Sequence, residues 1–210
     1  RGPRAMAEIV AGGENFGKKR QLETGVEGDI DRSKRQHISD SDRLAFKLLV
    51  SNKDAGTVIG KSGATIQNVQ GRTGCRVRIS NNNEFFPGTQ DRVVLITGTA
   101  DAIIMGAKAI VTELFENPIG EDHTVDPETK SVVITMLVPE KTSGVIIGKG
   151  GENIKHMIEE SGAKVKLNSK DSRIPGLDER VLTCDGKLPS AKRAMELVME
   201  KVLEEGAPGY

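Results

Sequence analysis

Tryptophan is absent from this 210-residue sequence, and aromatic residues make up only 3% of it. Folds that bind single strands by stacking bases on several exposed aromatic rings are therefore not expected. There are only two cysteines, Cys75 and Cys184, and three histidines at unrelated positions. These residues do not have the spacing of metal ligands, so we expect no metal and no cofactor. We expect both cysteines to be small buried thiols in a reducing compartment.

The sequence also has no excess of charge of either sign. Thirty Lys and Arg residues balance thirty Asp and Glu residues, so no global field attracts the chain to a polyanion or a membrane surface. No apolar run has the length of a membrane span, and we expect no membrane partner. Any binding of a polyanion must depend on a local patch.

What the sequence does contain is a repeat. The segment GTVIGKSGATI at Gly56 recurs as GVIIGKGGENI at Gly144, an offset of 144 − 56 = 88, and the register continues without insertion. Other matching positions are Val50 and Val138, Pro87–Gly88 and Pro175–Gly176, and Arg92–Val93 and Arg180–Val181. A period of this length is too long for a solenoid repeat, so each copy is expected to be a domain.

Each copy has the same pattern of predicted elements. A β-rich run (residues 44–50 and 131–138) precedes a short helix that ends at Gly60 or Gly148. A second helix runs from the next glycine to Gly74 or Gly162, followed by two strands and a long amphipathic helix. The predicted fold class is α+β, in the order βααββα, with a three-stranded antiparallel sheet covered on one face by three helices.

These patterns predict domains at residues 44–116 and 131–205. Residues 117–130 read as a polar linker, residues 1–43 as a disordered tail and residues 206–210 as a short C-terminal tail. The basic clusters Lys18–Arg20 and Arg32–Arg35 fit either nuclear-import signals or a solvated tail. We expect a nuclear or cytoplasmic location, or both.

The glycine-rich stretch raises the alternative of a nucleotide hydrolase. Ala55, Gly60, Lys61 and Ser62 fit a relaxed P-loop spacing. The second copy, however, has Ser143 and Gly150 at the corresponding positions, and neither copy offers the parallel sheet or the strand-ending acid that a P-loop site needs. We therefore expect no enzyme and no small-molecule substrate.

What both copies retain is a four-residue Gly-x-x-Gly turn between two helices, at residues 60–63 and 148–151. Its first glycine can end a helix with positive φ, and its second lets a sugar-phosphate backbone approach the next helix closely. Free amides and the helix dipole favour an anion at that helix start, and a lysine projects from each turn.

Both units resemble K-homology (KH) domains of the eukaryotic type I class, because VIGKSGATI and IIGKGGENI match the central signature of that family. Within the family, EFFPGTQDRVVLITGT most resembles Nova-type splicing regulators and, more distantly, poly(C)-binding proteins and hnRNP K. The resemblance implies sequence-selective binding of single-stranded RNA in pre-mRNA splicing or mRNA regulation. Each groove would accept about four nucleotides.

The resemblance also implies the binding residues. In the first unit they are Gly56, Thr57, Gly60, Lys61, Ser62, Gly63, Ile66, Val77, Ile79 and Arg92. In the second they are Gly144, Val145, Gly148, Lys149, Gly150, Gly151, Ile154, Val165, Leu167 and Arg180. The two arginines would read a cytosine-like base edge, whereas Val77 and Val165 could equally be core residues.

One position departs from the poly(C)-binding pattern. An arginine of the second helix is replaced by Gln70 in the first unit and by Ile158 in the second, which favours a mixed, pyrimidine-rich tetranucleotide containing CA. Tandem units could read nearby tetranucleotides on one strand. Single-stranded DNA remains open as a ligand. The alternative function is a protein-interaction module in which KH sheets or C-terminal helices self-associate.

Overall fold

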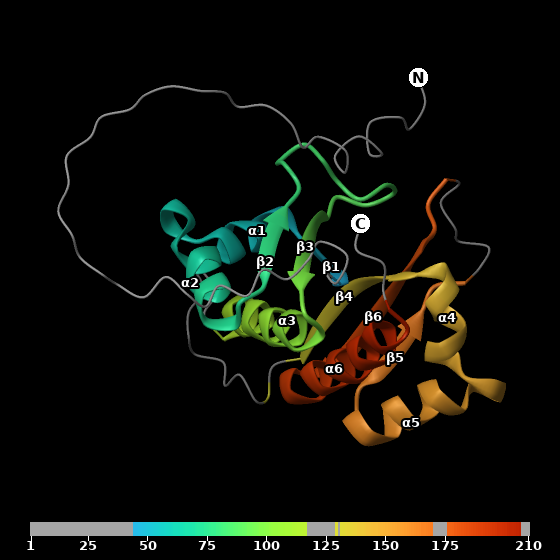
Figure 1. Ribbon diagram of the computed structural model, residues 1–210. Helices are drawn as coiled ribbons and strands as arrows, with labels where there is room; N and C mark the ends of the chain where they lie inside the picture. Colours follow the sequence, from blue (N-terminus) through green and yellow to red (C-terminus); the bar gives the residue numbers. More distant parts are fainter. Residues whose placement is uncertain (1–43, 117–128, 130, 170–175, 207–210) are drawn as a thin grey trace, which may run out of the picture.

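The computed structural model describes residues 44–116, 129, 131–169 and 176–206 (Figure 1). The predictions for the tail before residue 44, for nearly all of the linker and for the last four residues lie outside these ranges. We call residues 44–116 unit 1 and residues 131–205 unit 2.

The element order confirms the predicted βααββα pattern in both units. Unit 1 consists of β1 (Leu44–Val50), α1 (Asn52–Ile59), η3 (Lys61–Gly63), α2 (Ala64–Thr73), β2 (Arg76–Ile79), β3 (Arg92–Gly98) and α3 (Ala100–Phe115). Unit 2 consists of β4 (Ser131–Pro139), α4 (Glu140–Ile147), η4 (Lys149–Gly151), α5 (Glu152–Ser161), β5 (Lys164–Leu167), β6 (Glu179–Lys187) and α6 (Leu188–Glu204).

Local side chains and glycines set where the helices begin and end. The hydroxyl of Ser51 accepts a hydrogen bond from the amide of Asp54 at 3.1 Å and so caps α1. Thr99 caps α3 in the same way, by accepting from the amide of Ala102. Helices α2 and α5 end at Gly74 and Gly162, whose φ values of 72° and 69° are left-handed.

The two units share one six-stranded antiparallel sheet in the order β2-β3-β1-β4-β6-β5. Strands β1 and β4 pair across the boundary, with Leu48 opposite Met136. The sequence predicted two three-stranded sheets, and each is present, but their merger was not predicted. Figure 1 shows α3 and α6 side by side over this boundary, with α1 and α2 on one side of the molecule and α4 and α5 on the other.

A single apolar core runs beneath the helices of both units. Side chains on the helix-covered face form a row across all six strands, through cross-strand neighbours. The row includes Val77, Ile96, Phe46, Leu48, Met136, Ile134, Leu182, Cys184 and Val165. The merged sheet therefore buries a larger core than either unit could build alone.

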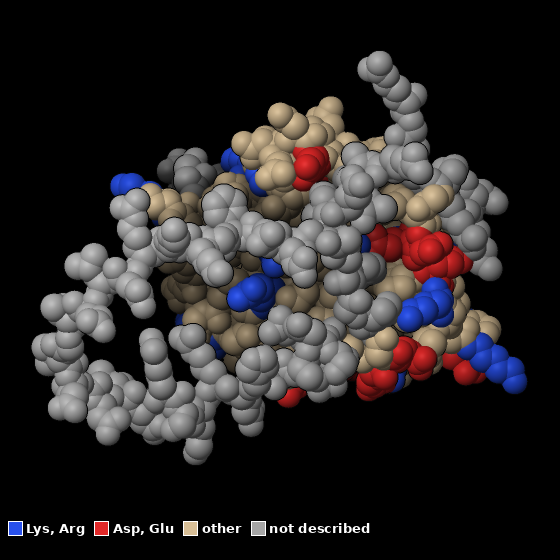
Figure 2. Space-filling model, turned by 45° about the horizontal axis from the view of Figure 1, so that its top comes forward, with Lys and Arg blue, Asp and Glu red and all other residues tan. Residues whose placement is uncertain are grey.

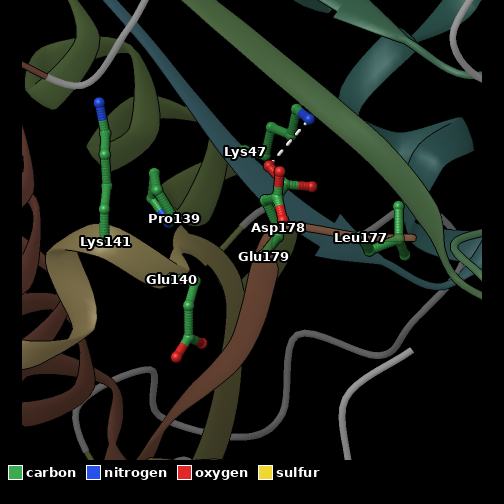
Figure 3. Close-up of a pocket in the computed structure, with 7 residues that line it drawn as sticks. All are labelled: Lys47, Pro139, Glu140, Lys141, Leu177, Asp178 and Glu179. Carbon is green, nitrogen blue, oxygen red and sulfur yellow. Dashed lines mark hydrogen bonds and ion pairs between the residues drawn. The ribbon is translucent and has the colours of Figure 1, made fainter. Parts of the chain in front are cut away.

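The opposite face of the sheet also links the units. Phe86, in the loop between β2 and β3, is buried against Leu49 of β1 and Leu137 of β4. Nearby, Lys47 Nζ lies 2.9 Å from Glu179 Oε1, and Figure 3 shows this pair in an open pocket of about 660 Å³. Its lining residues are Lys47, Pro139, Glu140, Lys141, Leu177, Asp178 and Glu179. The lining residues come from both units, and none of them belongs to a Gly-x-x-Gly turn.

The two units use different residue pairs where the long helix packs beside the edge strand. A Cβ added at Gly106 of α3 would lie 2.5 Å from the sulfur of Cys75, so this glycine makes room for that side chain. At the corresponding positions of unit 2 stand Ala194 and Ala163, both buried. One extra side-chain atom on the helix is thus matched by one fewer beside the strand.

We predict that Gly106→Ala lowers the free energy of unfolding by about 1–3 kcal/mol, because the added methyl overpacks against Cys75. Combining it with Cys75→Ala should restore most of that loss, since the pair then reproduces unit 2. Urea unfolding measures both. Gly71→Ala is the control: its Cβ would meet nothing within 4 Å, and helix propensity should raise stability by up to about 1 kcal/mol. Additive losses in the double variant would contradict the packing argument.

Candidate nucleic-acid interface

The Gly-x-x-Gly turn has the same backbone in both units. In unit 1, φ is 73° at Gly60, 55° at Ser62 and 80° at Gly63. In unit 2 the corresponding values are 73° at Gly148, 64° at Gly150 and 83° at Gly151. Three positive φ angles within four residues are strained for L-residues other than glycine, and Ser62 is the only such non-glycine residue in the part of the chain that the structure describes. The repeated conformation explains why glycine recurs at the first and fourth positions.

The first and last glycines of the turn serve different purposes. A Cβ at Gly60 would collide with the side chain of Thr65, and one at Gly148 would lie 2.7 Å from Asn153. Asn153 also donates from Nδ2 to the Val145 carbonyl at 2.7 Å, which ties α5 back to α4. At Gly63, by contrast, a Cβ would have no atom closer than 3.7 Å. The last glycine therefore keeps a positive φ while leaving the space in front of the turn open.

Each turn presents the start of a helix that lacks a side-chain cap. Gly63 precedes α2 and Gly151 precedes α5, and neither position supplies a capping side chain. The turn itself accepts from the first amides, because Gly63 donates to the Gly60 carbonyl and Gly151 to the Gly148 carbonyl, each at 3.2 Å. The helix dipole still places positive charge at the start of each helix. Lys61 and Lys149 are exposed in the turns. These features together suit an anion such as a phosphodiester group.

Aliphatic side chains lie between the second helix and the edge strand of each unit. Ile66 of α2 and Ile79 of β2 are half-buried and pack against the core, as do Ile154 of α5 and Leu167 of β5 in unit 2. The remaining candidates lie differently. Val77, Val165 and Thr57 are buried, Val145 is half-buried, and Gly56 and Gly144 are exposed on the first helix. Val77 and Val165 belong to the apolar core, as the sequence alternative allowed.

We call the candidate binding surface between the second helix and the edge strand groove 1 in unit 1 and groove 2 in unit 2. The two differ at the edge strand. The side-chain oxygen of Gln70 accepts a hydrogen bond from the Val77 amide at 2.9 Å, so it bridges α2 to the free edge of β2. The residue of unit 2 at this position is Ile158, an apolar side chain that is 36% exposed. An outward-pointing amide of an edge strand is a ready donor for a ligand. In groove 1 the Val77 amide is therefore already bonded to the Gln70 side chain, whereas groove 2 presents the apolar side chain of Ile158 at the same place.

Arg92, predicted to read a base edge, is only 5% exposed and is engaged by the protein itself. Its Nε donates to the Ser80 carbonyl at 2.8 Å, and its Nη1 donates to Asn82 Oδ1 at 2.7 Å and to Asn52 Oδ1 at 3.4 Å. It thereby joins the start of β3, the end of β2 and the first turn of α1. Its role in reading a base stays a prediction.

Arg180 occupies the matching place in unit 2 and is 4% exposed. It donates to the Asn168 carbonyl, as Arg92 does to Ser80, but its first-helix neighbour is Glu140 instead of an asparagine. Arg180 Nε lies 3.7 Å from Glu140 Oε2. A carboxylate offsets the guanidinium charge, whereas an amide does not. Groove 1 should therefore be the more electropositive of the two.

Sequence reasoning missed Asn52, Glu140, Thr65 and Asn153 as residues that shape the grooves. Aligning the copies at their offset of 88 shows that Asn52 corresponds to Glu140 and Thr65 to Asn153. The change from a neutral Asn52 to an acidic Glu140 could have indicated, from the sequence alone, that the two grooves differ in charge. The contacts that give it meaning join residues far apart in the chain, so they required the tertiary structure.

Charge around the grooves is local. On the face that Figure 2 shows, basic and acidic side chains lie in small separate groups. The basic residues that the sequence placed beside the grooves are all exposed: Arg72, Arg76 and Arg78 in unit 1, and Lys155, Lys164 and Lys166 in unit 2. Their positions allow local attraction of a polyanion by a chain with no net charge.

Among the described residues, no group of three or more His, Cys, Asp or Glu side chains could hold a metal ion. No helix there combines the length and apolarity that crossing a bilayer requires. Both cysteines are buried, as predicted, and burial raises the pKa of Cys184 to about 12 and that of Cys75 to a lesser extent. Cys184 is therefore a neutral thiol at physiological pH.

Comparison with known proteins identifies the repeated unit. The family model described as "KH domain" matches residues 45–112 and 133–200. The human RNA-binding protein Nova-2 is 34% identical over 199 residues, which cover 90% of this chain and 40% of Nova-2. The RNA-binding protein Pasilla of Drosophila melanogaster is 37% identical over 169 residues, which cover 78% of this chain and 22% of Pasilla. The chain thus spans less than half the length of these relatives.

Among solved structures, Dim2p from Pyrococcus horikoshii OT3 aligns with 79% of this chain and 93% of its own chain. The sequence identity is 17% and the TM-score is 0.28. A likeness of that size supports no argument about this chain.

We predict that Arg92→Ala destabilises unit 1 by about 1–3 kcal/mol, because the half-buried Ser80 carbonyl loses its donor and the links to Asn52 and Asn82 are lost. The loop between β2 and β3 should exchange its amide hydrogens faster. Urea unfolding and hydrogen-exchange mass spectrometry test this. Arg76→Ala, at an exposed position of β2, should change stability by less than about 0.5 kcal/mol. Equal stability of the two variants would show that the Arg92 hydrogen bonds do not support the fold.

Proposed function

Because this chain belongs to the KH domain family, we propose that it binds single-stranded RNA sequence-selectively in two grooves and acts in pre-mRNA splicing or mRNA regulation. The observation that carries the proposal is the left-handed Gly-x-x-Gly turn leading into an uncapped helix, with the same backbone in both units. The names of Nova-2 and Pasilla, both RNA-binding proteins, support it.

In the proposed mechanism, the turn holds the sugar-phosphate backbone and the aliphatic wall holds the bases. The positive ends of the α2 and α5 dipoles, together with Lys61 and Lys149, attract the phosphates. Bases lie along Ile66 and Ile79 in groove 1, and along Ile154 and Leu167 in groove 2. Each groove takes about four nucleotides. We propose pyrimidine-rich tetranucleotides that contain CA as the preferred ligand.

The merged sheet changes how one RNA strand would reach both grooves. The grooves border β2 and β5, which are the two outer strands of the sheet. Five strand spacings of about 4.8 Å put these edges about 24 Å apart along the sheet, and the intervening helices add to the path. Because β1 and β4 run antiparallel, equivalent strands of the two units point in opposite directions. A single RNA would have to reverse direction, with a spacer between its two tetranucleotides.

The protein-interaction alternative is less well supported. Self-association through β1 or α3 would use surfaces that already contact β4 and α6 of the same chain. Strands β2 and β5 retain free edges in the sheet. A role as scaffold would therefore have to use the same edges that border the proposed RNA grooves.

The central test is to repel phosphate at each turn in the full chain. We expect Lys61→Asp with Ser62→Asp to weaken groove 1, and Lys149→Asp with Gly150→Asp to weaken groove 2, each by about tenfold or more for its tetranucleotide. Fluorescence anisotropy at fixed salt, with RNA and DNA versions of the oligonucleotide, measures this. Asp is among the residues that tolerate a positive φ, so the turns should keep their backbone.

The matched control is Lys187→Asp with Ser131→Asp, which makes the same change of charge at exposed positions away from the turns. Its RNA affinity should stay close to that of the wild type. Turn variants that bind RNA as tightly as this control would refute the groove assignment. Tight binding of DNA alone would refute RNA as the ligand class.

A second test uses the difference between Asn52 and Glu140. In a chain whose turn in groove 1 carries the two Asp substitutions, Glu140→Asn should strengthen RNA binding in groove 2 about threefold to tenfold, because the Arg180 charge is no longer offset. The reverse change, Asn52→Glu in a chain with a disabled groove 2, should weaken groove 1. Binding isotherms at several salt concentrations measure both. No change in either direction would exclude an effect of the two arginines on the ligand.

A further inference from the structure

The boundary between the units lies on an approximate two-fold axis. Leu48 and Met136 occupy equivalent positions of the repeat, and they pair with each other across β1 and β4. On either side the register is reciprocal, with Lys47 opposite Leu137 and Leu49 opposite Thr135. A symmetric dimer has this property, in which equivalent residues meet on the axis. The boundary is therefore built as a dimer interface within one chain.

The same axis passes through the helical layer, between α3 and α6. Lys108 and Glu196 are 88 residues apart, which is the repeat offset, and Lys108 Nζ donates to Glu196 Oε1 at 2.9 Å. Equivalent positions thus face each other here too. In contrast to Leu48 and Met136, these two residues carry opposite charges.

Two further ion pairs flank this contact, one within α6 and one between the units. Arg193 Nη1 lies 3.2 Å from Glu196 Oε2 and holds it from the other side. Farther along, Lys192 of α6 lies 2.9 Å from Glu116, the residue that follows α3, and donates to the Thr112 hydroxyl at 2.8 Å. The pKa of Glu196 is lowered, and the hydrogen bond from Lys108 is the largest cause of this shift. Glu196 is therefore ionised at neutral pH.

A pairing of like units would lose this complementarity. Two copies of unit 1 joined in the same way would place Lys108 against Lys108, and two copies of unit 2 would place Glu196 against Glu196. Like charges at this separation repel, and the same rule rejects wrong partners in other paired helices. The apolar residues on the axis could not discriminate, because Leu48 and Met136 suit either pairing.

We propose that Lys108 and Glu196 make this surface selective for the unlike unit. The surface of unit 1 formed by β1 and α3 packs on the β4 and α6 surface of unit 2 from the same chain. Each surface disfavours pairing with a second copy of itself. Selectivity rests on complementary charge at the axis, while the strand pairing and the core supply the attraction. This inference concerns how the units assemble and is independent of the proposed RNA binding.

The test is a charge-reversal cycle in the full chain. Lys108→Glu and Glu196→Lys each place like charges on the axis, and the double variant K108E/E196K restores an opposite pair with reversed polarity. Hydrogen-exchange mass spectrometry of residues 44–50 and 131–139 reports the pairing of β1 with β4. We expect about threefold to tenfold faster exchange in each single variant, and recovery to within about twofold of the wild type in the double variant.

Two controls isolate the boundary. Exchange in β3, which pairs with β1 and β2 inside unit 1, should change much less than exchange in β4, and this comparison identifies a variant that merely unfolds unit 1. Lys201→Glu reverses a charge on α6 whose partner is Glu204 of the same helix, and it should leave β1 and β4 unaffected.

High salt should reduce the difference between each single variant and the wild type. Single variants that exchange like the wild type would overturn the proposal. A double variant that exchanges as fast as either single variant would overturn it as well.

Discussion

The antiparallel pairing of β1 with β4 is the interaction on which the rest of the architecture depends. It turns two three-stranded sheets into one, and it brings α3 and α6 together over a shared core. An unpaired strand edge is exposed to pairing with other chains, and here the inner edge of each unit covers that of the other. The free edges that remain belong to β2 and β5, and these edges border the candidate grooves. The boundary thus also determines how the two candidate grooves are placed relative to each other.

At each groove, the shape of the turn depends more on backbone conformation than on side-chain identity. The turn at residues 60–63 and its counterpart at residues 148–151 share their positive φ values although their central residues differ. Glycine is needed at the first position for lack of space and at the last for conformation. The candidate anion site is therefore a property of the main chain, and Lys61 and Lys149 add charge to it.

The two units share their backbone fold but differ in side-chain contacts at matched pairs of positions. Gly106 with Cys75 in unit 1 corresponds to Ala194 with Ala163 in unit 2, which conserves volume. Asn52 beside Arg92 corresponds to Glu140 beside Arg180, which changes charge. Lys108 and Glu196 diverged to opposite charges where they meet on the axis. Compensation within the core kept the fold, whereas divergence at the grooves and the axis made the two units unlike.

The sequence by itself determined the repeat, the order of the elements, the helix-ending glycines and the chemistry of the turn, because each depends on residues close together in the chain. It also predicted two buried cysteines and left the burial of Val77 and Val165 open. Only the tertiary structure decided that β1 pairs with β4, that Arg92 and Arg180 are buried and held by acceptors of their own units, and that Lys108 meets Glu196. A local pattern shows that a strand has an edge, but which edge it meets depends on the fit of side chains brought together from distant parts of the chain.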